Sequence, residues 1–122
     1  MSSLDNSPHW SAPERAQPLE HSLSLPGSKS LTNRELILAA LADGPSTIKR
    51  PLHSRDTRLM IDALRSLGAT ITEVPGDGAF GSDVSVTPIS PNHQVSASIN
   101  CGLAGTVMRF VPPLGRSEEH TC

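Results

Sequence analysis

Aromatic residues are almost absent from this sequence of 122 residues, which holds one Trp, two Phe and no Tyr. Proteins that bind single-stranded nucleic acids stack the bases on aromatic rings, so this scarcity argues against that class. Basic residues are not in excess either, because ten Lys and Arg face twelve Asp and Glu, and the formal net charge is −2. Any phosphate site must therefore be a local cluster, and no nucleic-acid partner is expected.

Cysteines and long apolar runs are scarce as well. The two cysteines, Cys101 and Cys122, offer no framework of paired bridges and no metal-ligand spacing, which favours a reducing compartment. No segment approaches the roughly 18 consecutive apolar residues of a membrane span, and the N-terminus lacks the basic and apolar regions of a signal sequence. We therefore expect a cytoplasmic protein that does not contact membranes.

The distribution of proline and apolar residues divides the chain into parts. Residues 1–19 carry Pro8, Pro13 and Pro18 and show no apolar period, so they are predicted to form a flexible leader. Residues 20–114 carry strand and helix patterns in alternation. Short strands are expected over residues 22–25, 47–49, 69–74, 83–87 and 96–100.

Three helices are expected between and after these strands. The first is capped by Ser28 or Ser30 and ends before Gly44. Its apolar face is formed by Leu31, Ile37, Leu38 and Leu41. The second is capped by Ser54 or Asp56 and stops at Gly68. Its apolar positions are Leu59, Met60, Ala63, Leu64 and Leu67.

A third helix is predicted from Thr106, which could cap it, and the pair Pro112 and Pro113 must end or kink it. A faint repeat, in which a helix, a glycine stop and a strand follow one another, recurs after about 23 residues. Its units are marked by Leu41, Gly44 and Ile48 and by Leu64, Gly68 and Ile71. Alternating strands and helices predict an α/β layer architecture, in which one unit cannot cover both of its own faces.

The richest cluster of polar residues lies at the predicted turn into the first helix, residues 26–34. Backbone N–H groups at a helix N-terminus favour a bound anion, and Lys29 adds a full positive charge. Ser30 and Arg34 lie one turn apart and can share a face with it. A P-loop is excluded because the required glycines are missing. The alternative is an ordinary capped helix with solvated charges.

A second glycine loop, residues 102–105, leads into the third helix. Gly105 would allow a ligand to approach the backbone closely, and Arg109 lies four residues further on. By itself this motif is weak, and a structural loop is the alternative. Together, two such loops suggest two anionic ligands, or one ligand with two anionic ends. Asp83, near a strand start, is interpreted as structural.

Three stretches, in this order, resemble the EPSP synthase family: LPGSKSLTNRELILAALADG at 25–44, SRDTRLMIDALRSLGA at 54–69 and CGLAGTVMRFVPP at 101–113. Three motifs in the same order make the resemblance, which spans roughly residues 20–114, highly specific. Leu103 and Phe110 stand where that family usually has Asn and Pro, which resembles its actinobacterial branch.

The resemblance implies a two-domain α/β fold built from βαβαββ units, of which this chain would supply the N-terminal part. It also implies transfer of the enolpyruvyl group of phosphoenolpyruvate to the 5-hydroxyl of shikimate 3-phosphate, on the way to chorismate and the aromatic amino acids. The reaction would pass through a tetrahedral intermediate, in a monomeric full-length enzyme with no metal or organic cofactor.

The same resemblance assigns roles to the two loops. Lys29 would be the catalytic candidate, in contact with both ligands. The other candidates are Ser30 and Arg34 for shikimate 3-phosphate, Gly105 and Thr106 for phosphoenolpyruvate, and Arg109 as a support of that loop.

Two alternatives remain open at this point. UDP-N-acetylglucosamine 1-carboxyvinyltransferases share the fold and the enolpyruvyl donor, but they usually have Asn where this chain has Ser30. A stand-alone phosphate-binding module could use the same Lys29, Ser30 and Arg34. Saturable binding of shikimate 3-phosphate by the chain alone would favour the module.

Members of the family are far longer, and their acid/base carboxylate, a second Lys and several arginines lie in the part absent here. We therefore expect the chain by itself not to turn over substrate. Residues 115–122 depart from the family pattern, and their Arg-Ser-Glu-Glu-His-Thr run resembles the conceptual translation of a sequencing adapter. These residues are predicted to be a non-native tail.

Overall fold

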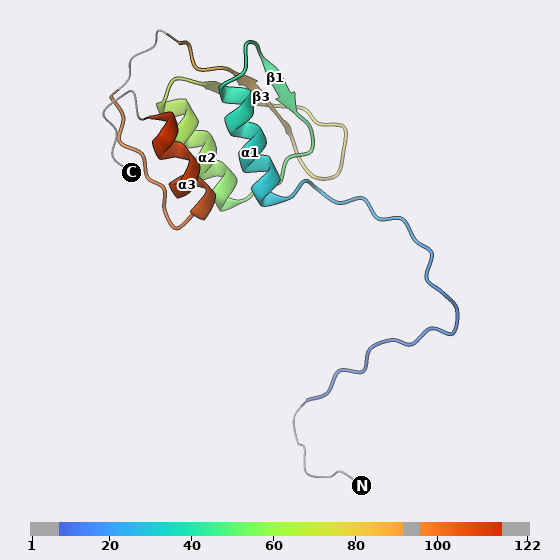
Figure 1. Cartoon of the computed structure of the whole chain (residues 1–122). Coiled ribbons are helices and arrows are strands. Elements are labelled where there is room, and N and C mark those ends of the chain that lie inside the picture. The colour runs from blue at the N-terminus through green and yellow to red at the C-terminus, as the bar shows by residue number, and fades with distance from the viewer. Residues whose placement is uncertain (1–7, 92–95, 116–122) are drawn as a thin grey trace.

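Two helices cover one face of a small sheet, and a third helix packs against both of them (Figure 1). The computed structural model describes residues 8–91 and 96–115. The elements in chain order are α1 (Lys29–Ala40), β1 (Ser46–Ile48), α2 (Arg55–Ser66), β2 (Thr70–Val74), β3 (Asp83–Thr87) and α3 (Gly105–Leu114). This alternation of helices and strands confirms the predicted α/β class.

The sheet has the strand order β1-β3-β2, with both pairs antiparallel. The last strand in the sequence therefore lies in the middle, and β1 and β2 run parallel on either side of it. Val84 pairs with Ile48, and Val86 pairs with Ile71. These side chains are buried under the helices, because alternate residues of a strand point to the same face of a sheet.

The second helix forms as the sequence predicts. Ser54 caps it through a capping box with Thr57, and Gly68 follows it with φ +110°, a conformation that favours glycine. Four of its five predicted apolar side chains are buried, namely Met60, Ala63, Leu64 and Leu67. The fifth, Leu59, is partly buried. Arg65 then fixes the helix end to the sheet by donating two hydrogen bonds to the Ile71 carbonyl.

The first helix begins after the predicted cap Ser28, but it ends at Ala40 with Leu41 as its C-cap, earlier than the expected stop at Gly44, and it buries a different face. Leu31, Leu38 and Leu41 are 52%, 69% and 57% exposed, so these three predicted core positions are wrong, whereas the fourth, Ile37, is partly buried against the core. The buried positions are instead Thr32, Asn33, Leu36, Ala39 and Ala40. Small alanines let α1 approach α2 and the sheet closely, and of its leucines Leu36 is buried with them while Leu31 and Leu38 remain exposed.

Two predicted strands do not form. Residues 22–25 have no strand partner among the described residues, and Leu23 and Leu25 are each 74% exposed. A strand needs a neighbour to satisfy its backbone groups, so this segment stays extended and runs away from the helices (Figure 1). In the segment 96–100, a single bridge residue, Ser98, is all that forms.

The third helix continues through the proline pair that was expected to end or kink it. Pro112 and Pro113 lie in the last turn of α3, which ends one residue later at Leu114. The backbone N–H of Gly115 donates to the Val111 carbonyl at 3.2 Å and closes this turn. Neither proline has an N–H to donate to the carbonyl four residues earlier, and the helix ends directly after the pair.

The two ends of the chain were predicted to be a leader and a tail. Residues 8–19 form neither helix nor strand, and Trp10 is 81% exposed. Residues 1–7 and 116–122, with Cys122, lie outside the described residues. Cys101 is buried. Within the described ranges, no helix is long and apolar enough to cross a membrane.

Candidate functional site

The turn into α1 exposes the residues predicted to bind shikimate 3-phosphate to solvent. Ser28 is the cap, and its hydroxyl accepts a hydrogen bond from the Leu31 N–H at 3.1 Å. Lys29 and Ser30 follow in the first turn, Arg34 lies one turn further on, and all three are exposed. Their side chains are therefore available to a ligand at the positive end of the helix dipole.

Contacts with the linker before α2 hold this turn in place. The Gly27 N–H donates to the Arg50 carbonyl at 3.0 Å, and the Leu52 N–H donates to the buried Thr32 hydroxyl at 3.1 Å. Asp83, at the start of β3, accepts from the Arg50 N–H at 2.9 Å. This bond gives Asp83 the structural role that the sequence predicted.

The N-terminus of α2 adds an acidic group that the sequence analysis did not connect with Lys29. The Lys29 ammonium lies 3.1 Å from the Asp56 carboxylate, and their side chains are 51% and 20% exposed. Asp56 is in the first turn of α2, so the ion pair joins the starts of two helices. Lys29 still exposes half of its side chain, which leaves it open to an anionic ligand.

The loop before α3 brings the second predicted group to the same end. Gly102 has φ +54°, and its N–H donates to the Asn100 side chain at 2.9 Å. Ala104 is the N-cap and makes no side-chain hydrogen bond, so the prediction that Thr106 caps α3 is wrong. Gly105 is exposed in the first turn, and a Cβ added to it would meet nothing within 4 Å.

Thr106 binds to α1 instead of capping its own helix. Its hydroxyl accepts a hydrogen bond of 2.5 Å from the side-chain amide of Asn33, which is 0% exposed. Sequence patterns did not single out Asn33, because a polar residue within a helix is most often solvated. The one available signal was its place in the spacing of α1, three residues before the buried Leu36.

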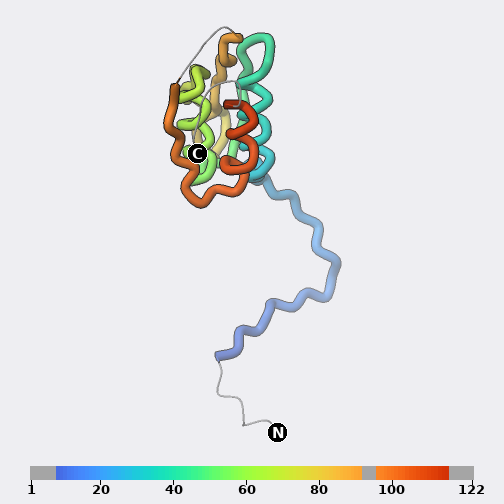
Figure 2. Tube along the Cα trace, turned by 60° about the vertical axis from the view of Figure 1, so that its left-hand side comes forward, coloured from blue at the N-terminus to red at the C-terminus, as the bar shows by residue number. Residues whose placement is uncertain are grey.

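Taken together, the starts of all three helices converge at one end of the molecule. Lys29 links α1 to α2, Asn33 links α1 to α3, and Gly102 packs against Arg55 at the start of α2. The turned view shows the three helices rising side by side from this end (Figure 2). Three helix dipoles therefore point their positive ends to one region, which holds five of the predicted residues. Arg109 lies one turn into α3 and is exposed.

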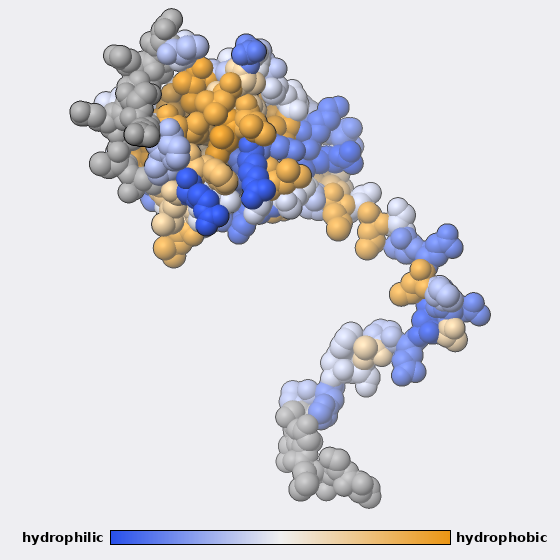
Figure 3. Space-filling view, viewed as in Figure 1, coloured by the Kyte–Doolittle hydropathy of each residue, from blue (hydrophilic) through white to orange (hydrophobic). Residues whose placement is uncertain are grey.

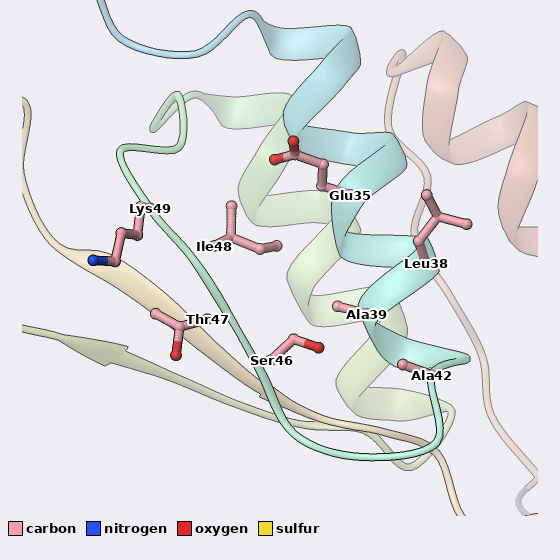
Figure 4. A pocket seen from close by; sticks show the side chains of 8 residues that line it. All are labelled: Glu35, Leu38, Ala39, Ala42, Ser46, Thr47, Ile48 and Lys49. Atoms are coloured by element: carbon pink, nitrogen blue, oxygen red, sulfur yellow. The ribbon is translucent and has the colours of Figure 1, made fainter.

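A depression elsewhere on the surface lacks these residues. It has a volume of about 430 Å³ and lies between α1 and β1, where Glu35 and Lys49 are its charged residues (Figure 4). Its other lining residues are Leu38, Ala39, Ala42, Ser46, Thr47 and Ile48. It contains none of the residues predicted to bind a ligand, so the N-terminal ends of the helices remain the candidate site.

Comparison with known proteins identifies the family. The sequence model of EPSP synthase (3-phosphoshikimate 1-carboxyvinyltransferase) matches residues 13–120. The chain belongs to the EPSP synthase family. Two similar curated proteins are 3-phosphoshikimate 1-carboxyvinyltransferases of Kocuria rhizophila, 54% identical over 108 residues, and of Bifidobacterium longum, 51% identical over 106 residues. Both relatives are actinobacterial, as Leu103 and Phe110 predicted.

The match covers only part of these EPSP synthases. Each alignment takes in 86% of this chain but 24% of the Kocuria rhizophila protein and 23% of the Bifidobacterium longum protein. The chain thus spans about a quarter of the length of these relatives. Among solved structures, EPSP synthase from Acinetobacter baumannii is similar with a TM-score of 0.54 and 24% identity, over 73% of this chain and 20% of that one. This likeness supports the fold.

Proposed function

We propose that this chain forms part of the substrate site of an enzyme that transfers the enolpyruvyl group of phosphoenolpyruvate to the 5-hydroxyl of shikimate 3-phosphate. The observation that carries the proposal is the convergence of three helix N-termini beside Lys29. Each helix start offers free N–H groups and partial positive charge, which suits substrates that are phosphorylated anions. The membership in the EPSP synthase family supplies the reaction.

The residues divide between the two substrates. Ser30 and Arg34, on α1, bind shikimate 3-phosphate, and Gly105 with Thr106, on α3, lines the pocket for phosphoenolpyruvate. Lys29, at the start of α1, contacts both ligands, and Arg109 supports the loop before α3. In the addition step, the 5-hydroxyl oxygen loses its proton and bonds to the central carbon of phosphoenolpyruvate, while the methylene carbon of phosphoenolpyruvate gains a proton and becomes a methyl group. In the elimination step, the bond between the central carbon and the phosphate oxygen breaks, the methyl group loses a proton, and the double bond forms again as inorganic phosphate leaves. Fixed cations stabilise the charge that develops in this tetrahedral intermediate.

The remaining parts of the proposal concern the protein as a whole. Residues 20–114 are the transferase segment, residues 1–19 are a leader and residues 115–122 are a non-native tail. The full-length enzyme is a cytoplasmic monomer that does not bind nucleic acids. Re-sequencing the source DNA across the codons for residues 114–122 tests the tail, because a frame that continues into further α/β units would support it and a genuine stop would contradict it.

A chimera tests the activity. Residues 20–114 replace the aligned segment of the Kocuria rhizophila relative, which supplies the three quarters of the enzyme that this chain does not match. We expect the chimera to release phosphate from phosphoenolpyruvate when shikimate 3-phosphate is present and not when UDP-N-acetylglucosamine replaces it. A folded chimera that binds neither shikimate 3-phosphate nor phosphoenolpyruvate would contradict the proposal.

Replacing Gly105 with alanine in the chimera is expected to weaken phosphoenolpyruvate binding and leave the fold intact. The added Cβ meets no protein atom within 4 Å, so it occupies space that a ligand would use. Alanine is also about 0.5–1 kcal/mol better than glycine within a helix. We expect an unchanged or higher Tm together with a raised KM for phosphoenolpyruvate, both measured on the purified chimera. A normal KM would contradict the pocket assignment.

Replacing Gly102 with alanine is the matched comparison, because it should act on the fold. Its Cβ would lie 2.9 Å from both the Arg55 guanidinium and a methyl group of Leu59, and φ is +54°. A non-glycine residue in this region costs on the order of 1–3 kcal/mol. We expect a lower Tm of the chimera by differential scanning calorimetry. A Tm equal to that of Gly105→Ala would show that the loop tolerates a side chain.

A further inference from the structure

Asn33 is a fully buried polar side chain in α1, the helix that carries the proposed residues for shikimate 3-phosphate. It is 0% exposed, yet its amide group reaches another helix and donates to the Thr106 hydroxyl at 2.5 Å. The two residues are 73 positions apart in the sequence. A threonine hydroxyl both donates and accepts, so the link exists for either orientation of the amide.

The other half of this amide is unsatisfied. The Asn33 carbonyl oxygen is buried and has no hydrogen-bond partner among the described residues. A buried polar atom without a partner destabilises the folded state, and an apolar side chain would avoid that cost. Such a residue therefore contributes little net stability, and its role is better explained by what its hydrogen bond positions.

We infer that Asn33 is a positioning residue that holds Thr106 and the start of α3 in the geometry that binds phosphoenolpyruvate. The inference rests on the proposed function, because it assumes that Gly105 and Thr106 line that pocket. The inference predicts an effect on one substrate only. Asn33 lies on α1, which carries the proposed residues for shikimate 3-phosphate, but its replacement should weaken the binding of phosphoenolpyruvate. Ser30 and Arg34 are exposed and do not depend on this bond, so shikimate 3-phosphate should bind normally.

Thr32 provides a matched control on the same helix. It is 3% exposed, it is the neighbour of Asn33, and its hydroxyl accepts a hydrogen bond from the Leu52 N–H, which belongs to the linker and not to α3. Replacing either residue with alanine removes a buried polar group and leaves a cavity. Both variants should therefore lose stability, whereas only the Asn33 variant should move Thr106.

The experiment measures both KM values and Tm for Asn33→Ala and Thr32→Ala in the chimera. We expect Asn33→Ala to raise the KM for phosphoenolpyruvate by roughly 3- to 10-fold, the equivalent of one hydrogen bond, with the KM for shikimate 3-phosphate unchanged. Thr32→Ala should lower Tm and leave the KM for phosphoenolpyruvate unchanged, and any rise in KM should be confined to shikimate 3-phosphate, because Thr32 holds the turn that carries Ser30. Asn33→Leu repeats the test with the cavity filled, in case the alanine variant does not fold.

A double variant checks that the effect passes through Thr106. If Asn33 acts by holding that hydroxyl, Asn33→Ala combined with Thr106→Val should have a phosphoenolpyruvate KM no higher than that of Thr106→Val alone. Independent, multiplying effects would overturn the inference, as would an Asn33→Ala variant with a lower Tm and a normal phosphoenolpyruvate KM. A chimera without substitutions that binds neither substrate would contradict the proposed function, and the inference about Asn33 would fail with it.

Discussion

Replacing Lys29 with methionine in the chimera is expected to lower kcat/KM by at least about 100-fold, since a hydrogen bond to a charged group is worth about 1.5–3 kcal/mol and this ammonium is proposed to contact two anions. A second effect acts in the same direction. The Asp56 carboxylate, 3.1 Å from the ammonium, would lose its counter-charge and repel incoming phosphates. Steady-state kinetics on phosphate release measures the loss.

The sequence contains a matched control, because Lys49 is its only other lysine. Lys49 is exposed and follows β1, where it lines the depression between α1 and β1, which contains none of the predicted site residues (Figure 4). Lys49→Met changes the net charge of the protein by the same amount as Lys29→Met. We expect the kcat/KM of the Lys49→Met variant to match that of the unmodified chimera. Equal losses in the two variants would mean that Lys29 acts only through the general field of the protein.

The isolated chain is expected to aggregate or to melt without a cooperative transition, because α1 and α3 leave apolar side chains uncovered. Leu38 of α1 is 69% exposed and Met108 of α3 is 52% exposed, and an apolar groove of about 370 Å³ lies between Arg34, Ile37, Leu38 and Phe110. In the space-filling view, apolar atoms form a broad surface over these helices (Figure 3). Patches of this kind mark contacts with other protein surfaces.

Sedimentation velocity and a thermal melt on the isolated chain test this expectation. Replacing Leu38 and Leu41 with lysine should reduce self-association of the isolated chain, since both side chains are more than half exposed. The same pair of substitutions should destabilise the chimera, where the rest of the enzyme would cover these positions. A monomeric isolated chain with a cooperative melt well above room temperature would contradict the prediction.

The contrast between α2 and α1 explains how much of the fold the sequence could predict. In α2, the apolar residues form one face and the opposite face is polar, so the pattern identified the buried side correctly. In α1, the exposed side carries Leu31 and Leu38 and the buried side carries Leu36, so the positions of the leucines did not identify the core. Ala39 and Ala40 are buried instead, because only small side chains permit the close contact with α2. A helix that is apolar on both sides needs cover that this chain does not supply.

The candidate site was predictable where local chemistry defines it and not where distant contacts do. Lys29, Ser30 and Arg34 follow a capped turn, and Gly105 lies in a glycine loop, so both groups could be recognised from neighbouring residues. The pairing of Lys29 with Asp56 and of Asn33 with Thr106 depends on how three helices pack. Nothing in the residues around Asn33 indicates that its partner lies 73 positions away.

The strand order has a consequence for how the chain is made. β1 and β2 are synthesised first, but each pairs only with β3, so neither has a partner until the ribosome has added residues as far as Thr87. The pairing of β1 with β3 is expected to be the slower of the two, because α2 and β2 lie between these strands in the sequence and a long loop must close, whereas β2 and β3 are consecutive strands. The bond to Thr106 forms later still. During synthesis, the starts of α1 and α2 therefore exist before α3 does, and the proposed phosphoenolpyruvate pocket is the last part of the site to appear.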